Sequence, residues 1–262
     1  MKLQFYKYQG TGNDFVLVDN RHNIFGKYDA KRIAFLCDRK FGIGADGLIL
    51  LEDDLESDFK MIYFNSDGHQ SSMCGNGGRC IVAFAKYLGI IDCKTKFNAI
   101  DGMHHAEISN GQIHLEMQEV TRIEKHKNHT FLDTGSPHHV EMIKEELERF
   151  EVQTFGAKIR YNEPYANKGV NVNFVNKISD TAFAVRTYER GVEDETLSCG
   201  TGVTAVALSM HNTGETEAQI ISLKTQGGEL KVSFSPTEGG YNNIKLIGPA
   251  VQVFKGEIEW KP

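Results

Sequence analysis

The pattern of apolar and polar positions along the chain predicts a protein in which strands outnumber helices. Short runs rich in aromatic and aliphatic residues are typical of strands, and they occupy residues 48–51, 59–64, 113–117, 170–175, 182–188 and 230–234. Apolar side chains switch to helical spacing between Ile81 and Gly89, and residues 203–210 are apolar on nearly every side. We expect both of these helices to be buried, and two further helices at residues 29–40 and 141–150.

An internal duplication repeats the surroundings of Cys74 at Cys199, 125 residues later. Each cysteine precedes a Gly-x-Gly that opens one of the two helices expected to be buried. The same offset pairs further glycines along the chain, namely Gly75 with Gly200, Gly77 with Gly202, Gly89 with Gly214 and Gly102 with Gly227. A period of this length matches one small domain and not a solenoid repeat. The sequence therefore predicts two related lobes.

The predicted fold class is α/β (α+β), with two pseudo-symmetric lobes that each form a mostly antiparallel curled sheet or barrel around a central buried helix. We expect an N-terminal lobe of residues 1–119 and 250–262 that carries Cys74, and a C-terminal lobe of residues 120–249 that carries Cys199. The active site is expected in the cleft between these lobes.

Composition and charge argue against several functional classes. The chain has 262 residues with 29 basic and 35 acidic side chains, and it has no basic cluster of the kind that binds nucleic acid. No apolar stretch approaches the roughly 18–20 residues of a membrane span, and the N-terminus lacks a signal-peptide pattern. Five cysteines without a short-range framework indicate free thiols in a reducing compartment. We therefore expect a cytoplasmic protein without nucleic-acid or membrane partners.

The positions of Cys74 and Cys199 suggest a pair of acid–base groups. At a helix N-terminus, free backbone N–H groups and the helix dipole can bind an anion and favour ionisation of a thiol. Two equivalent thiols suit inversion of a carbon stereocentre, because the proton leaves from one face and returns to the other. Sulfur atoms at about 3–3.5 Å from that carbon would lie roughly 6.5–7.5 Å apart. The helix N-termini would stabilise the charge that spreads onto the adjacent carboxylate.

Other motifs carry no predicted site. Residues 42–47 spell G-x-G-x-x-G, but a helical pattern precedes them and a strand follows, the reverse of a dinucleotide site. Cys37 and Cys80 lie on apolar helix faces, so we expect them in the core. The adjacent histidines at 104–105 and 138–139 lack a second spaced set of zinc ligands. No metal or cofactor is expected.

Seven short motifs, spread over nearly the whole chain, resemble the motif series of the diaminopimelate epimerase family. They are G-T-G-N-D-F at residues 10–15, N-S-D-G at 65–68, M-C-G-N-G at 73–77, S-P-H at 136–138, G-V-N-V-N-F at 169–174, Y-E-R-G at 188–191 and S-C-G-T-G at 198–202. The resemblance implies a homodimeric enzyme, independent of pyridoxal phosphate and metals. That enzyme converts LL-2,6-diaminopimelate to the meso form, for lysine and peptidoglycan synthesis.

The resemblance also implies roles for single residues. Cys199 as a thiolate removes the α-proton of the LL substrate, and Cys74 as a thiol donates a proton to the opposite face, with the roles exchanged in the reverse direction. His138 and Glu189 are implied to tune these thiols. The residues implied in substrate binding are Asn13, Gly47, Asn65, Gly75, Asn76, Ser136, Asn171, Glu189, Arg190, Gly200 and Thr201.

Two of these positions depart from the family pattern, because Gly47 stands in place of a glutamine and Ser136 in place of an asparagine. The serine can still donate or accept a hydrogen bond. Glu189 can hold an ammonium group, and the guanidinium of Arg190 can bind a carboxylate through two hydrogen bonds. Phe254 falls where family members often carry a dimer-contact tyrosine.

Three alternative functions remain open from the sequence. A proline racemase-like enzyme shares the two-cysteine logic, but Asn76 and the adjacent Glu189 and Arg190 favour a diamino-diacid substrate. A redox or metal-binding thiol protein using Cys74 and Cys80 leaves the duplication at Cys199 without a purpose. The third alternative is an inactive protein that only binds an amino acid.

Overall fold

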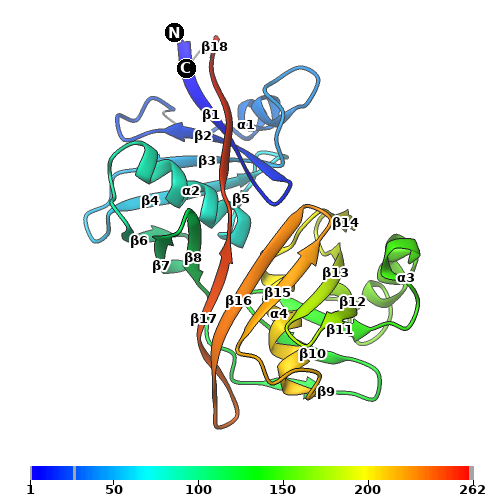
Figure 1. Ribbon diagram of the computed structural model, residues 1–262. Helices are drawn as coiled ribbons and strands as arrows, with labels where there is room; N and C mark the ends of the chain where they lie inside the picture. Colours follow the sequence, from blue (N-terminus) through cyan, green and yellow to red (C-terminus); the bar gives the residue numbers. More distant parts are fainter. Residues whose placement is uncertain (1, 26–27, 260–262) are drawn as a thin grey trace. The chain divides into compact units, whose positions relative to one another are not determined.

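The protein folds into two compact units, Met1–Leu115 with Pro249–Pro262, and Glu116–Gly248 (Figure 1). The computed structural model describes residues 2–25 and 28–259, so positions 1, 26–27 and 260–262 of the predicted N-terminal lobe lie outside the described residues. Strands outnumber helices in both units, and the predicted sheet-dominated α/β class is confirmed. Within the described residues, no helix combines the length and the apolar character needed to cross a membrane.

The first unit contains one mixed sheet with two helices in the connections. Its strands are paired in the order β18 (Val251–Glu259), β1 (Lys2–Gly10), β2 (Asn13–Asp19), β3 (Gly47–Glu52), β4 (Phe59–Asn65), β6 (Lys94–Ala99), β7 (Gly102–Ser109) and β8 (Gln112–Glu116). The short β5 (Gln70–Ser71) pairs with β4. Among its described residues only β2–β3 and β4–β6 are parallel pairs, and their connections contain α1 (Ala30–Cys37) and α2 (Gly75–Tyr87).

The second unit repeats this arrangement. Its strands are paired in the order β9 (Ile123–Lys125), β10 (Thr130–Asp133), β11 (Pro137–Met142), β12 (Asn171–Ser179), β13 (Ala182–Glu189), β15 (Ile220–Thr225), β16 (Gly228–Thr237) and β17 (Gly240–Gly248). The short β14 (Asp194–Thr196) pairs with β13. The pairs β11–β12 and β13–β15 are parallel, and their connections contain α3 (Val152–Arg160) and α4 (Gly200–Asn212).

The duplication therefore extends from the matched glycines to the whole topology. The two outermost strands also correspond, because β9 follows β8 in the chain and pairs with β10, while β18 follows β17 and pairs with β1. In both units the second helix comes directly after the short strand, so the two cysteine-bearing helices occupy equivalent places.

The helices expected to be buried are the two that begin after the cysteines. In α4, shown in yellow in Figure 1, every residue from Gly202 to Met210 is buried. These side chains join an apolar cluster with strands of their own unit, which includes Val185, Leu223 and Leu246. The expectation that this helix, which is apolar on nearly every side, is buried is confirmed.

The remaining two helices were predicted with different success. The helix expected at residues 29–40 is α1, which begins after the N-cap Asp29 and ends at Cys37. It stops early because the Asp38 carboxylate accepts hydrogen bonds from the N–H groups of Lys40 and Phe41 and so stabilises a turn.

The helix expected at residues 141–150 is wrong. Glu141 and Met142 belong to β11 and pair with β12, and only a single 3-10 turn, Leu147–Arg149, follows. The pairing with β12 outweighs the local preference of this acidic and basic segment for helix. The helix of this connection is α3, and its Gly156, a poor helix former, weakened the sequence signal.

Candidate active site

Cys74 is the N-cap residue of α2, as the sequence predicted. Its backbone is extended (φ −101°, ψ 147°), and its Sγ accepts a hydrogen bond of 3.2 Å from the N–H of Gly77. The amides of Gly75 and Asn76 also belong to this first turn, where backbone N–H groups have no acceptor within the helix. Because the positive end of the helix dipole lies here, the turn favours a negatively charged sulfur.

Cys199 holds the equivalent position at the start of α4. Its backbone is extended as well (φ −118°, ψ 114°), the side chain is buried, and Sγ lies 3.5 Å from Oγ1 of Thr201. The backbone carbonyl of Thr201 accepts a hydrogen bond from Oγ1 of Thr134, which ties the helix start to the β10–β11 turn. Both predicted catalytic residues are therefore N-caps of buried helices.

The predicted residues of the first unit gather where three strands meet. Asn13 begins β2, Gly47 begins β3, and Asn65 ends β4 directly opposite Gly47. The Asn13 amide is fixed at both ends, because Nδ2 donates to Asp46 at 2.6 Å and Oδ1 accepts from Nδ2 of Asn76 at 3.2 Å. This contact joins the sheet edge to the first turn of α2.

Steric contacts explain why position 47 is a glycine. A Cβ atom built there would lie 2.6 Å from the carbonyl oxygen of Phe64 and 2.6 Å from Cε2 of Tyr63, closer than real Cβ atoms approach. The hydroxyl of Tyr63 would lie 3.2 Å from the same point. The tyrosine ring therefore fills the space in which a longer side chain at position 47 would begin. Tyr63 was not among the predicted site residues.

Three predicted residues of the second unit form one hydrogen-bonded group. Oγ of Ser136 accepts from Nδ2 of Asn171 at 3.1 Å and from Nη2 of Arg190 at 3.2 Å. The backbone N–H of Arg190 donates to Oδ1 of Asn171 at 2.8 Å. Glu189 lies at the end of β13, and its Oε2 accepts a hydrogen bond from Oγ1 of Thr196 at 2.9 Å. The sequence-distant serine, asparagine and arginine are thus brought together as expected of a polar binding site.

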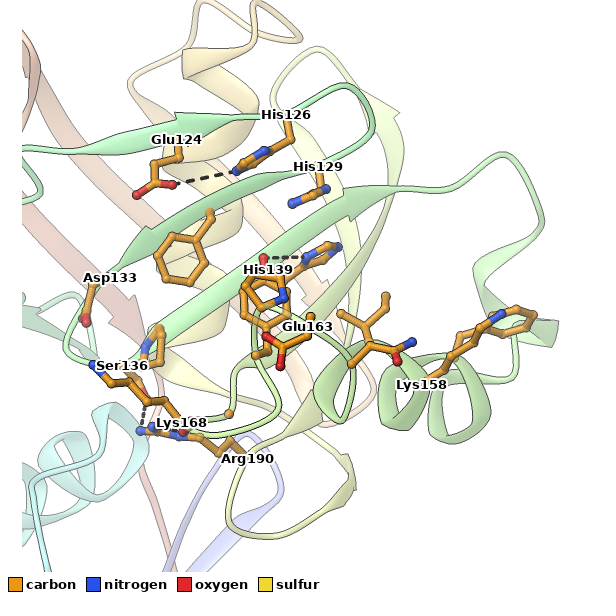
Figure 2. A pocket seen from close by; sticks show the side chains of 18 of the residues that line it. Glu124, His126, His129, Asp133, Ser136, His139, Lys158, Glu163, Lys168 and Arg190 are labelled. Carbon is orange, nitrogen blue, oxygen red and sulfur yellow. Dashed lines mark hydrogen bonds and ion pairs between the residues drawn. The ribbon is translucent and has the colours of Figure 1, made fainter.

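A cavity of about 1040 Å³ begins at Ser136 and Arg190 and extends over the sheet face (Figure 2). Its far end is lined by stacked imidazoles, with ring centroids 4.4 Å apart between His126 and His129 and 4.0 Å apart between His129 and His139. Burial and the two neighbouring imidazoles lower the pKa of His129 to about 4. This histidine is therefore uncharged at neutral pH.

His138 is fully buried beside this group and belongs to a separate network. Its Nδ1 lies 3.1 Å from Nδ2 of Asn173, which also donates to the carbonyl oxygen of His139 at 3.1 Å. Oδ1 of Asn173 accepts from Oγ1 of Thr187 at 3.0 Å. Burial, and to a smaller extent the charge of Arg190, lower the pKa of His138 to about 3.

This network fixes the state of His138. Because Asn173 donates to Nδ1, that nitrogen is the acceptor and Nε2 carries the hydrogen of the neutral ring. Nε2 is buried and has no hydrogen-bond partner in the part of the chain that the structure describes. At neutral pH the His138 ring is therefore uncharged, with an N–H at Nε2 that is able to donate a hydrogen bond.

Asn173 was missed by the sequence analysis, although a signal for it was present. Asn171 and Asn173 alternate in β12, and alternating residues of a strand share one face. A Cβ atom at Gly202 in the first turn of α4 would lie 2.5 Å from Oδ1 of Asn173. The asparagine therefore contacts both the His138 ring and the turn that follows Cys199.

The remaining predicted cysteines lie in the core, as expected. Cys37 and Cys80 are buried free thiols, and burial raises the pKa of Cys37 to about 12 and that of Cys80 further. Neither can act as a thiolate near neutral pH, which argues against the redox role considered for Cys80. Phe254 lies on β18, where its half-exposed ring packs edge-on against Phe5.

Comparisons with known proteins agree with the motif series. The sequence pattern of the diaminopimelate epimerase family matches residues 5–125 and 130–253. The chain is 57% identical over 257 residues to the diaminopimelate epimerase of Flavobacterium psychrophilum, covering 98% of this chain and 100% of the relative. It is 38% identical over 277 residues to that of Aquifex aeolicus, covering 98% of each chain.

Solved structures with low sequence identity share the fold. A PhzF-family phenazine biosynthesis protein from Bacillus anthracis superposes with a TM-score of 0.77 at 12% identity, covering 99% of this chain and 100% of that one. A hydroxyproline epimerase from Agrobacterium vitis superposes with a TM-score of 0.69 at 14% identity, covering 98% and 92%. At this level of identity the likeness concerns the fold alone.

Proposed function

Because the chain belongs to the diaminopimelate epimerase family, we propose that it converts LL-2,6-diaminopimelate to the meso epimer by a two-base thiol and thiolate mechanism. One observation carries the mechanism: Cys74 and Cys199 are the N-cap residues of equivalent helices in a duplicated fold. The reaction uses no pyridoxal phosphate and no metal. Its product serves lysine and peptidoglycan synthesis.

In the forward direction, two proton transfers take place at the α-carbon. The Cys199 thiolate takes the α-proton of the LL substrate and becomes a thiol. The electron pair of the broken C–H bond remains on the α-carbon and spreads onto the adjacent carboxylate. The Cys74 thiol then gives its proton to the opposite face of that carbon and becomes a thiolate, and the two roles are exchanged in the reverse reaction.

The first turns of α2 and α4 stabilise the charge that develops on the carboxylate. Their amides, at Gly75, Asn76, Gly200 and Thr201, are donors without intrahelical acceptors, and the helix dipoles add positive potential where negative charge appears. Because these donors are held by buried helices, they need no rearrangement during the reaction.

The distal half of the substrate carries a second ammonium and a second carboxylate. We assign the carboxylate to Arg190, whose guanidinium donates to Oγ of Ser136 and to the carbonyl oxygen of Lys168. Glu189 suits the ammonium. Asn13 and Asn65 complete the binding set at the sheet edge of the first unit. The Tyr63 hydroxyl takes the place of the contact that a glutamine at position 47 makes in relatives.

His138 and Glu189 tune the thiols in this proposal. His138 acts through its Nε2–H, since the ring is neutral and Nδ1 is already an acceptor. A donated hydrogen bond lowers the energy of a thiolate without adding a competing base.

We also propose a cytoplasmic homodimer. The strand β18 presents the half-exposed side chains of Val251, Val253 and Phe254, and a patch of this kind suits a contact between two copies. Five free thiols suit a reducing compartment.

The experiment is incubation of the protein with LL-diaminopimelate in heavy water without added cofactor. The expected product is the meso epimer with deuterium at the inverted α-carbon, because the donated proton comes from a thiol that exchanges with solvent. Cys74→Ala and Cys199→Ala abolish turnover, whereas Cys93→Ser, at an exposed thiol, leaves it unchanged. Absence of product, or racemisation of L-proline in its place, refutes the assignment.

A further inference from the structure

A fully buried positive charge lies in α2, close to Cys74. The Arg79 side chain has 0% exposure. Its Nε donates to the carbonyl oxygen of Pro249 at 3.2 Å, and its Nη1 donates to that of Gly75 at 3.1 Å. Its Nη2 donates to Oδ1 of Asn76 at 2.9 Å and to a threonine hydroxyl, Oγ1 of Thr11, at 3.2 Å.

All four acceptors are neutral, although a buried charge is costly unless an opposite charge accompanies it. No carboxylate forms an ion pair with Arg79 among the residues that the structure describes. The ionisable groups whose charge acts on it are the thiols of Cys80 and Cys74. Cys80 stays neutral because burial raises its pKa. Cys74 is therefore the available counter-charge.

The duplicated helix shows that the fold does not need a cation at this place. Thr204 in α4 corresponds to Arg79 by the 125-residue offset. It is also fully buried, and its Oγ1 donates at 2.9 Å to the carbonyl oxygen of Gly200, the counterpart of Gly75. A neutral hydroxyl thus satisfies the same carbonyl group. The positive charge of Arg79 is therefore not required to satisfy this carbonyl group.

We propose that Arg79 is the internal counter-cation of the Cys74 thiolate and makes Cys74 the more readily ionised of the two thiols. This inference rests on the proposed function of the pair. In the substrate-free protein the Cys74 proton is then released to solvent while Cys199 keeps its own. The resting protein is therefore the form that takes a proton from the meso substrate, and the LL substrate reacts with the other form, in which Cys74 has regained a proton from solvent and Cys199 has lost its own.

Arg79 is also a positioning residue for the substrate-binding amides. Its contact with Oδ1 of Asn76 leaves Nδ2 of that amide to donate to Asn13. The Arg79 guanidinium therefore orients the side-chain amides of Asn76 and Asn13 and also places positive charge at the first turn of α2.

The test is the pH dependence of iodoacetamide alkylation, followed separately at Cys74 and Cys199 by peptide mass spectrometry. In the wild-type protein the alkylation midpoint of Cys74 lies below that of Cys199. Arg79→Gln raises the Cys74 midpoint by about one pH unit, a tenfold loss of thiolate below the midpoint. Arg79→Lys keeps the charge and retains most of the effect. The exposed Cys93 reports the intrinsic reactivity of the reagent in each sample.

Several outcomes overturn the proposal. An unchanged Cys74 midpoint in a folded Arg79→Gln variant removes the electrostatic role. Equal shifts in the Gln and Lys variants assign the effect to the hydrogen bonds and not to the charge. If the Gln variant does not fold, a wild-type Cys74 midpoint at or above that of Cys199 refutes the proposal. Alkylation needs no turnover, so a lack of epimerase activity would refute the proposed function separately.

Discussion

The duplicated helix starts allow a matched test of how closely α4 is packed against the polar network beneath it. In Gly202→Ala, the new Cβ would lie 2.5 Å from Oδ1 of Asn173 and 3.2 Å from Cβ of Cys199. In Gly77→Ala, the equivalent change in α2, the nearest atoms are Sγ of Cys74 at 3.2 Å and Cδ1 of Ile49 at 3.3 Å. Only the contact with Asn173 is closer than real Cβ atoms approach, whereas the others require the neighbouring atoms to give by a few tenths of an ångström.

The two substitutions should differ in stability by about 2–3 kcal/mol. Alanine gains about 0.5–1 kcal/mol over glycine in a helix, and this gain applies to both. At position 202, the Asn173 amide cannot withdraw without losing its bonds to Thr187 or His138. A buried polar group left unpaired costs about 1–3 kcal/mol, and overpacking costs about 1–3 kcal/mol. At position 77, the ends of flexible side chains can yield, so the change stays within about 1 kcal/mol.

Thermal unfolding followed by far-UV circular dichroism measures the difference. For chains of this size about 2–4 °C corresponds to 1 kcal/mol, so Gly202→Ala should melt roughly 5–10 °C below Gly77→Ala. The matched position makes helix propensity common to both variants. Equal melting temperatures, or a Gly202→Ala protein as stable as wild type, would refute the idea that Asn173 is held rigidly under the turn.

Three further predictions concern stability. Gly156→Ala places a Cβ 2.4 Å from Cβ of Tyr188, and we expect a loss of about 1–3 kcal/mol in urea unfolding; a neutral result means that α3 shifts freely. Burial alone would raise the pKa of Asp14, but hydrogen bonds from Arg39 and Lys7 outweigh the effect of burial and lower this pKa to about 2. Its stabilisation is therefore present above pH 3.8 and is lost as the pH falls through about 2, so the destabilisation by Asp14→Asn should shrink on acidification, and a constant difference contradicts the assignment. Burial lowers the pKa of His138 to about 3 from an ordinary value of 6.5. Between these pH values only the unfolded chain binds a proton at this residue, so the free energy of unfolding falls as the pH falls, by at most about 1.4 kcal/mol per pH unit. His138→Gln should flatten this slope, and an unchanged slope argues against a neutral buried ring.

The sequence by itself determined the features that depend on local physics. Apolar residues at helical spacing in α2, and an apolar surface on nearly every side of α4, indicate buried helices. A cysteine followed by Gly-x-Gly indicates where each helix begins, and these expectations hold for both. The recurrence of glycines at one offset revealed the duplication, since both copies must build the same helix turn. Seven short motifs were enough to identify the family, because they contain the predicted catalytic and substrate-binding residues.

Only the tertiary structure decided the pairings between distant segments. Residues 141–142 became strand because β12 supplies parallel partners, and no local pattern contains that information. The local sequence also does not predict the contacts of the buried polar residues Asn173 and Arg79. Asn173 reaches His138 and Thr187 across neighbouring strands, and Arg79 is enclosed by neutral acceptors from other parts of its unit. Burial and hydrogen-bond partners set the charge state of such groups, and both exist only after the chain has folded.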